Sequence, residues 1–173
     1  QLQALHLGEF AEDSFTYGLI DNPVVVPPPP FESQTPGTVT ITVIGLNDVP
    51  TAADVGIAAN EDGVIVNGSF VGDDVDNDDD VDTLVYTIKT DLPSGSGAVT
   101  NNGDGTFTFD PKPGVDFQQL AENETLDVTF TYTATDGHGA ESSEGTVTVT
   151  VTGENDLPVA VNDTYSIDQD QQL

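Results

Sequence analysis

The chain has 173 residues and carries 31 Asp and Glu residues against only two Lys, which gives a formal net charge of −29 at pH 7. Such a charge repels nucleic acid and anionic membrane surfaces, so we exclude both as partners. The absence of cysteine excludes a disulfide framework and a thiolate metal site. No apolar run is long enough to span a bilayer, and we expect no membrane insertion.

Residues 1–48 have the pattern of the C-terminal part of a β-sandwich repeat. Phe15, Tyr17 and Leu19 alternate with other residues, as expected for a half-buried strand. The segment at 22–37 contains four consecutive prolines, which favour polyproline II and exclude a central strand. A stiff spacer and a ligand for a proline-recognising groove are alternatives. We interpret it as an elongated hairpin loop, because surface loops tolerate insertions.

A thirteen-residue phrase occurs twice, as TVTITVIGLNDVP at 38–50 and TVTVTVTGENDLP at 146–158. Its first half alternates Thr with Val or Ile, which is typical of a strand, and its Gly, Asn-Asp and Pro then end that strand. The copies lie 108 residues apart, which is the length of a domain rather than of a solenoid repeat. We therefore predict a complete repeat at 49–157 and, at 158–173, the first strand of a following repeat.

Between the two copies the sequence predicts short strands separated by turns. At 125–135, apolar residues alternate with Thr, so one face of this strand is apolar and the other carries hydroxyls. Seven short strands without a helical pattern predict an all-β fold of tandem Greek-key β-sandwich modules, and the strand order, immunoglobulin-like or related, stays open. The predicted strands are 55–59, 64–71, 83–90, 98–101, 106–110, 125–135 and 145–152.

Acidic residues crowd the stretch GDDVDNDDDVD at 72–82. Carboxylates at such density repel one another, so a folded loop holds them only if they are protonated or bridged by cations. Ca²⁺ is the natural candidate, because it takes roughly six to eight oxygen ligands from carboxylates, amides and backbone carbonyls. The stretch lacks the central Gly and the final Glu of an EF-hand loop. A solvated acidic loop, or adaptation to high salt, is the alternative for this run alone.

Further motifs at predicted strand ends resemble the cadherin-like repeats of large bacterial surface adhesins, the family that includes VCBS and related RTX-adhesin modules. The resemblance covers nearly the whole chain, and it depends on the order and spacing of several motifs. These motifs are ANEDG with Glu61, DDVD with Asp74 and Asp76, ENET with Glu122 and Glu124, YTATDG with Asp136, and GENDLP with Asn155 and Asp156.

In cadherin repeats calcium lies at the junction between consecutive domains, so the resemblance implies two junction sites here. The first would use Asn47, Asp48, Asp74, Asp76 and Asp136, together with Glu9 or Glu12 from the preceding module. The second would use Glu61, Glu122 or Glu124, Glu154, Asn155 and Asp156. Asp78 and Asp80 would hold an additional ion within the module. Leu46 stands where the second copy has Glu154, so the first junction lacks one carboxylate.

The sequence offers no catalytic constellation. His138 lies near Asp136, but no serine motif, phosphate-binding loop or zinc spacing accompanies it, so we interpret it as a polar turn residue. Paired carboxylates also serve glycoside hydrolysis, but the chain has no Trp to provide a sugar platform. We therefore expect a protein that is not an enzyme.

The resemblance implies a calcium-stiffened extender repeat of a secreted adhesin or surface fibre, located outside a bacterial cell. Its partners would be neighbouring repeats of the same or an identical chain, and a cell-surface or matrix ligand is an open alternative. Two other functions stay open: an adhesive module that binds glycan or peptide, and a fibre subunit whose partial modules are completed by strand exchange between chains. The partial modules also fit a fragment of a longer array.

Overall fold

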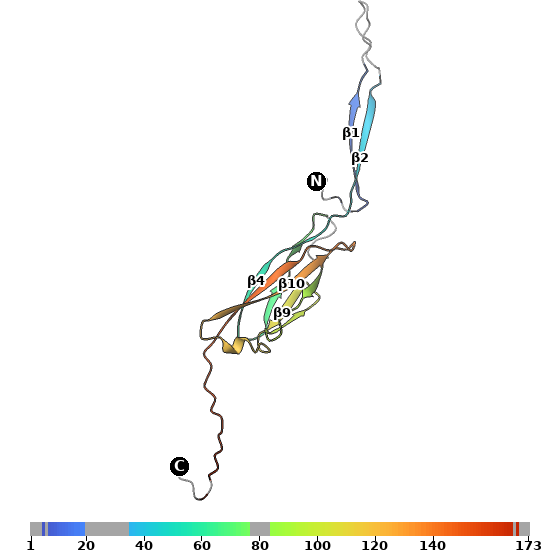
Figure 1. The fold of residues 1–173 in the computed structure, drawn as a ribbon. Helices are drawn as coiled ribbons and strands as arrows, with labels where there is room; N and C mark the ends of the chain where they lie inside the picture. The colour runs from blue at the N-terminus through green and yellow to red at the C-terminus, as the bar shows by residue number, and fades with distance from the viewer. Residues whose placement is uncertain (1–4, 6, 20–34, 77–83, 168, 170–173) are drawn as a thin grey trace, which may run out of the picture.

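The computed structural model describes residues 5, 7–19, 35–76, 84–167 and 169. These residues form a hairpin, then a module of nine strands, then an extended segment (Figure 1). The hairpin consists of β1 (Phe10–Tyr17) and β2 (Gly37–Ile44). The strands of the module are β3 (Thr51–Ala52), β4 (Val55–Asn60), β5 (Val66–Ser69), β6 (Gly72–Asp73), β7 (Val85–Thr90), β8 (Ala98–Asn101), β9 (Thr106–Asp110), β10 (Thr125–Thr135) and β11 (Gly145–Thr152), with a 3₁₀ turn at Phe117–Gln119.

The module is a β-sandwich, as predicted. One sheet has the order β4-β11-β10-β7, in which β4 and β11 are parallel, and the facing sheet has the order β5-β9-β8. The strand predicted at 64–71 is divided, because β5 pairs with β9 whereas β6 pairs with β3 in a separate two-stranded sheet. The chain thus changes its pairing partner at Phe70–Val71, and the alternation of side chains alone does not indicate such a change.

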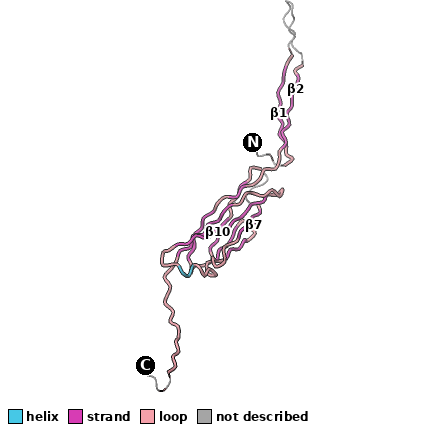
Figure 2. Tube along the Cα trace, in the orientation of Figure 1, coloured by secondary structure: helices cyan, strands magenta, loops and turns pink. Residues whose placement is uncertain are grey.

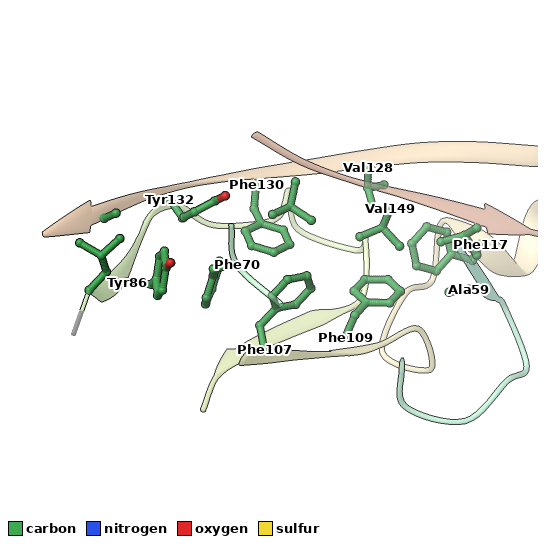
Figure 3. Close-up of a cluster of buried hydrophobic side chains, with 14 residues drawn as sticks. Ala59, Phe70, Tyr86, Phe107, Phe109, Phe117, Val128, Phe130, Tyr132 and Val149 are labelled. Atoms are coloured by element: carbon green, nitrogen blue, oxygen red, sulfur yellow. The ribbon is translucent and has the colours of Figure 1, made fainter. Parts of the chain in front are cut away.

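The core lies between the two sheets and is rich in aromatic rings (Figure 3). Phe130 and Tyr132 on β10 point inward, as the alternation at 125–135 predicts, and they are 1 % and 0 % exposed. The Phe70 ring contacts Tyr132 and Phe107, with centroid separations of 4.7 and 5.0 Å. Such pairs contribute about 0.5–1.5 kcal/mol each beyond the burial of their area, so this cluster fixes the spacing of the two sheets.

The β1–β2 hairpin is a structural copy of the β10–β11 pair. Tyr17 lies opposite Gly37 in the hairpin, and Tyr132 lies opposite Gly145 in the module. The remaining residue pairs of the β1–β2 register follow the β10–β11 register in the same order. The repeated phrase of the sequence is therefore also a structural repeat, because its two copies form β2 and β11, the second strands of equivalent antiparallel pairs.

The copy differs from the original in what covers its apolar face. Phe15 of β1 is 55 % exposed, whereas its counterpart Phe130 is buried by the facing sheet. Among the described residues no third strand pairs with the hairpin. Most of the proline-rich loop predicted at 22–37 lies outside the described residues.

The hairpin projects from one end of the sandwich, and the chain after β11 leaves from the opposite end (Figures 1 and 2). Residues 158–167, expected to begin a following repeat, are extended but form no ladder with any described strand. A strand needs hydrogen-bonding partners along an edge, and none is present beside this segment in the described part of the chain. Within the described residues, no helical segment has the length and apolar character that a membrane crossing demands.

Candidate metal-binding junctions

Three loops meet at the end of the module that faces the hairpin. The linker after β2 carries Asn47, whose Nδ2 donates a hydrogen bond to Oδ2 of Asp136 at 2.8 Å. The backbone N–H of Asp48 donates to Oδ2 of Asp76, also at 2.8 Å, and the N–H of Asp76 donates to Oδ1 of Asp74 at 3.0 Å. The structure therefore brings together the five linker and module residues that the sequence assigned to the first junction.

Asp136 is held rigidly by the turn after β10. It is 5 % exposed, and its Oδ1 accepts hydrogen bonds from the backbone N–H groups of His138 and Ala140 at 2.9 and 2.8 Å. Burial raises the pKa of this carboxyl, but hydrogen bonds from the Asn47 side chain and from the N–H groups of Ala140, His138 and Gly139 together hold the pKa below its usual value. Asp136 is therefore an anion at neutral pH.

Buried oxygens at this end accept no hydrogen bond from the described residues. Among them are Oδ1 of Asp76, a residue that is 3 % exposed, and Oδ1 of Asn47. Burying a carboxylate oxygen without a donor is costly, and a bound cation removes that cost. Carboxylate and amide oxygens are ligands that Ca²⁺ prefers. The residues at this end fit a calcium site.

The opposite end of the module is built around Glu61. The parallel pairing of β4 with β11 brings Asn60 opposite Thr152, so the residues that follow the two strands lie at one edge. Glu61 is 0 % exposed, and its Oε1 accepts a hydrogen bond from the backbone N–H of Glu154 at 2.5 Å. Its Oε2 is buried and accepts no bond from the described residues. The second junction thus shows the same feature as the first, a buried carboxylate with one oxygen left for a cation.

A surface pocket of about 300 Å³ lies at this end, and Asn60 and Asn123 are lining residues that sequence reasoning missed. Asn60 donates to Oε1 of Glu154 at 2.6 Å, and Asn123 adopts a positive φ of 65° in the loop before β10. Asn60 and Asn123 are sequence neighbours of predicted glutamate ligands, in ANEDG and ENET, and this proximity could have identified them from the sequence. The pocket is lined by Asn60, Glu122, Asn123, Thr152, Gly153, Glu154 and Asn155.

Other predicted ligands have different surroundings. Oε2 of Glu124 accepts a hydrogen bond from the backbone N–H of Ala121 at 2.9 Å, so this carboxylate caps its own loop. Asp156 is exposed in the segment that leaves the module. Asp78 and Asp80, expected to hold an additional ion, lie outside the described residues.

Glu9 lies at the base of the hairpin, where its backbone carbonyl accepts a hydrogen bond from Gly45 at 2.8 Å. Glu12, the alternative ligand, lies within β1 opposite Thr42. In the described ranges no three His, Cys, Asp or Glu side chains converge on one metal position. A Ca²⁺ ion at either end would therefore take amide and backbone oxygens as well as carboxylates, which is its usual mixture of ligands.

Comparison with known proteins gives one family and several solved structures. The family described as bacterial cadherin-like domain matches residues 47–153. No curated protein matches the chain. Drosophila N-cadherin EC1-4 is 15 % identical, with 86 % of this chain and 34 % of that chain covered and a TM-score of 0.43. Mouse clustered PcdhgC3 EC1-3 is 14 % identical, with 83 % and 44 % covered and the same TM-score. The chain thus spans less than half the length of these structures.

Proposed function

The chain belongs to the bacterial cadherin-like domain family, and from this premise we propose that it is an extender repeat of an extracellular bacterial adhesin or surface fibre, stiffened by calcium at its junctions. The family is a non-enzymatic adhesion fold, which agrees with the absence of a catalytic motif in the sequence. One observation carries the proposal. At each end of the sandwich a buried carboxylate, Asp76 or Glu61, has an oxygen that accepts no hydrogen bond from the described residues.

The chemistry of the donor set favours calcium. All candidate ligands are oxygens of carboxylates, amides or the backbone, and the sequence has no cysteine. Hard divalent cations prefer such ligands, whereas zinc prefers nitrogen and sulfur. Mg²⁺ demands near-ideal octahedral geometry and keeps its water, so a loose assembly from three loops suits Ca²⁺ better. When bound, the ion supplies positive charge that compensates the buried carboxylates.

The hairpin supports a place in a tandem array. Because β1–β2 repeats the register of β10–β11, we assign the hairpin to the closing strand pair of a preceding repeat, whose other strands would cover the exposed face of Phe15. The second copy of the repeated phrase leads in the same way into residues 158–167. The partners of the module are then its neighbouring repeats.

The residues explain how an ion would stiffen the first junction. Without a cation, the acidic groups of the linker and the module repel one another, and the hydrogen bonds from Asn47 and Asp48 oppose this repulsion. A bound cation would attract oxygens of both the linker and the module, and the linker would then keep one orientation relative to the module.

Thermal unfolding of the chain in calcium and in chelator tests the proposal, at one ionic strength so that screening is equal in both samples. Extracellular modules bind calcium with a Kd of about 10⁻⁴ to 10⁻³ M, so 10 mM calcium stabilises the module by about 1.4–2.7 kcal/mol per site. The melting temperature should rise by roughly 4 °C or more.

Asp76→Asn should lose much of that rise, because a neutral amide replaces the buried carboxylate. The matched control is Asp127→Asn, which removes the same charge from an exposed position on β10 and keeps an acceptor for Thr150. It should retain the full rise. Equal melting temperatures of the wild-type chain in calcium and in chelator would contradict the proposal.

A further inference from the structure

The loop before β10 and the residues after β11 are tied by two backbone hydrogen bonds. The N–H of Asn123 donates to the carbonyl of Gly153 at 3.0 Å, and the N–H of Gly153 donates to the carbonyl of Glu124 at 2.8 Å. This tie places Glu122, directly before Asn123, and Glu154, directly after Gly153, on the lining of the same pocket.

The base of the hairpin repeats this tie. The N–H of Gly8 donates to the carbonyl of Gly45 at 3.2 Å, and the N–H of Gly45 donates to the carbonyl of Glu9 at 2.8 Å. Gly8 also has a positive φ of 82°, as Asn123 has at the equivalent position. The two junctions can therefore be compared residue by residue, from local geometry as well as from the repeated phrase.

The comparison shows that two carboxylates are missing together at the first junction. Leu7 occupies the position of Glu122, and Leu46 occupies the position of Glu154. Sequence reasoning found the second replacement only, because LGE and ENE have little similarity outside their structural context. The other equivalent ligands are retained, namely Glu9 for Glu124, Asn47 for Asn155 and Asp48 for Asp156.

Neither leucine is explained by burial. Leu7 is 49 % exposed and Leu46 is 73 % exposed. At the second junction, Glu122 and Glu154 line one pocket and could share a cation. The equivalent place at the first junction, which we call its outer part, has two leucines and no such pair of carboxylates. The inner part of the first junction, around Asp76 and Asp136, keeps its carboxylates. Calcium affinity depends on the number of charged ligands, so the two parts differ in their capacity for ions.

We propose that the junction between the hairpin and the module binds one calcium ion fewer than the junction after the module, and that it is the more flexible hinge of the two. This inference rests on the calcium-binding function proposed above. Leu7 and Leu46 stand at the positions where the second junction has the carboxylates of Glu122 and Glu154, so the first junction lacks these two ligands.

Calorimetric titration of the full chain with calcium tests the inference through the double variant Leu7→Glu/Leu46→Glu. Both positions are exposed, so the fold should tolerate the change, and circular dichroism checks that it does. The restored carboxylate pair should raise the stoichiometry by about one ion per chain and should increase the calcium-induced rise in melting temperature. The matched control, Leu7→Gln/Leu46→Gln, has similar size and polarity without charge, and it should titrate as the wild type does.

The outcomes separate the inference from the function on which it rests. If the wild-type chain takes up no calcium, the proposed function fails and the inference fails with it. If the wild type binds calcium but the Glu and Gln variants share its stoichiometry and melting behaviour, the inference is overturned while the proposed function stands. A gain confined to the Glu variant supports both.

Discussion

Glu61 is the residue at which folding and ion binding oppose each other most directly. Its carboxylate is fully buried, one oxygen is satisfied by the N–H of Glu154, and the other accepts no hydrogen bond from the described residues. Burying such a charge destabilises the fold when no cation is present. The same charge attracts Ca²⁺ when the ion is available. The stability of the module in chelator and its response to calcium should therefore change in opposite directions when this charge is removed.

Glu61→Gln tests this opposition. In chelator the variant should melt at or above the wild-type temperature, with a gain of about 1–2 kcal/mol, because the side-chain oxygen still accepts from Glu154 while the buried charge is gone. In 10 mM calcium the variant should gain less stability than the wild type does. Differential scanning calorimetry under both conditions measures the two effects. A variant that is less stable in chelator and keeps the full calcium response would show that Glu61 is only a structural acceptor.

At the end of the module that faces the hairpin, the sequence predicted which residues lie together better than it predicted their contacts. Asn47 and Asp136 were assigned to one site although 89 residues separate them, and the structure brings their side chains into a hydrogen bond. The motif order carried this information. By contrast, Glu124 caps its own loop, and Leu7 was not seen as the counterpart of Glu122. Both depend on the backbone geometry of the loops before β1 and β10, which side-chain patterns do not encode.

At the level of elements, Tyr132 links strands that belong to different sheets. Its hydroxyl lies 2.5 Å from the carbonyl of Ala53, to which it donates, and it accepts a hydrogen bond from the N–H of Val71 at 3.1 Å. These bonds join β10 to the segments beside β3 and β6. Alternation predicted that Tyr132 faces the core. It did not predict the hydrogen-bond partners of the hydroxyl, because tertiary pairing decides that the chain divides into β5 and β6 at Phe70–Val71.

Tyr132→Phe should destabilise the module by about 1–3 kcal/mol, because it removes two part-buried hydrogen bonds of the hydroxyl, to Val71 and Ala53, while it preserves the ring packing. Urea unfolding with unchanged m-value is the appropriate measurement. Tyr165→Phe is the matched control, since Tyr165 is 78 % exposed and its substitution should leave stability unchanged. Equal destabilisation by the two substitutions, or by neither, would rule out the hydroxyl as the link between these strands.

For the molecule as a whole, the net charge of −29 and the joint between hairpin and module determine shape together. Salt at 0.15 M screens exposed charges beyond a Debye length of about 8 Å, but it does not bridge the carboxylates of the linker and the module. We therefore expect small-angle scattering in 0.15 M NaCl with chelator to show a broad distribution of interatomic distances. A few millimolar calcium should narrow that distribution while it changes the ionic strength little.

The same concentration of magnesium should narrow the distribution less, because Mg²⁺ gives up its water reluctantly. Asp76→Asn should remove the calcium effect, and Leu7→Glu/Leu46→Glu should enlarge it. Identical profiles with calcium, magnesium and chelator would mean that the joint is set by hydrogen bonds such as that between Asn47 and Asp136, with no contribution from an ion.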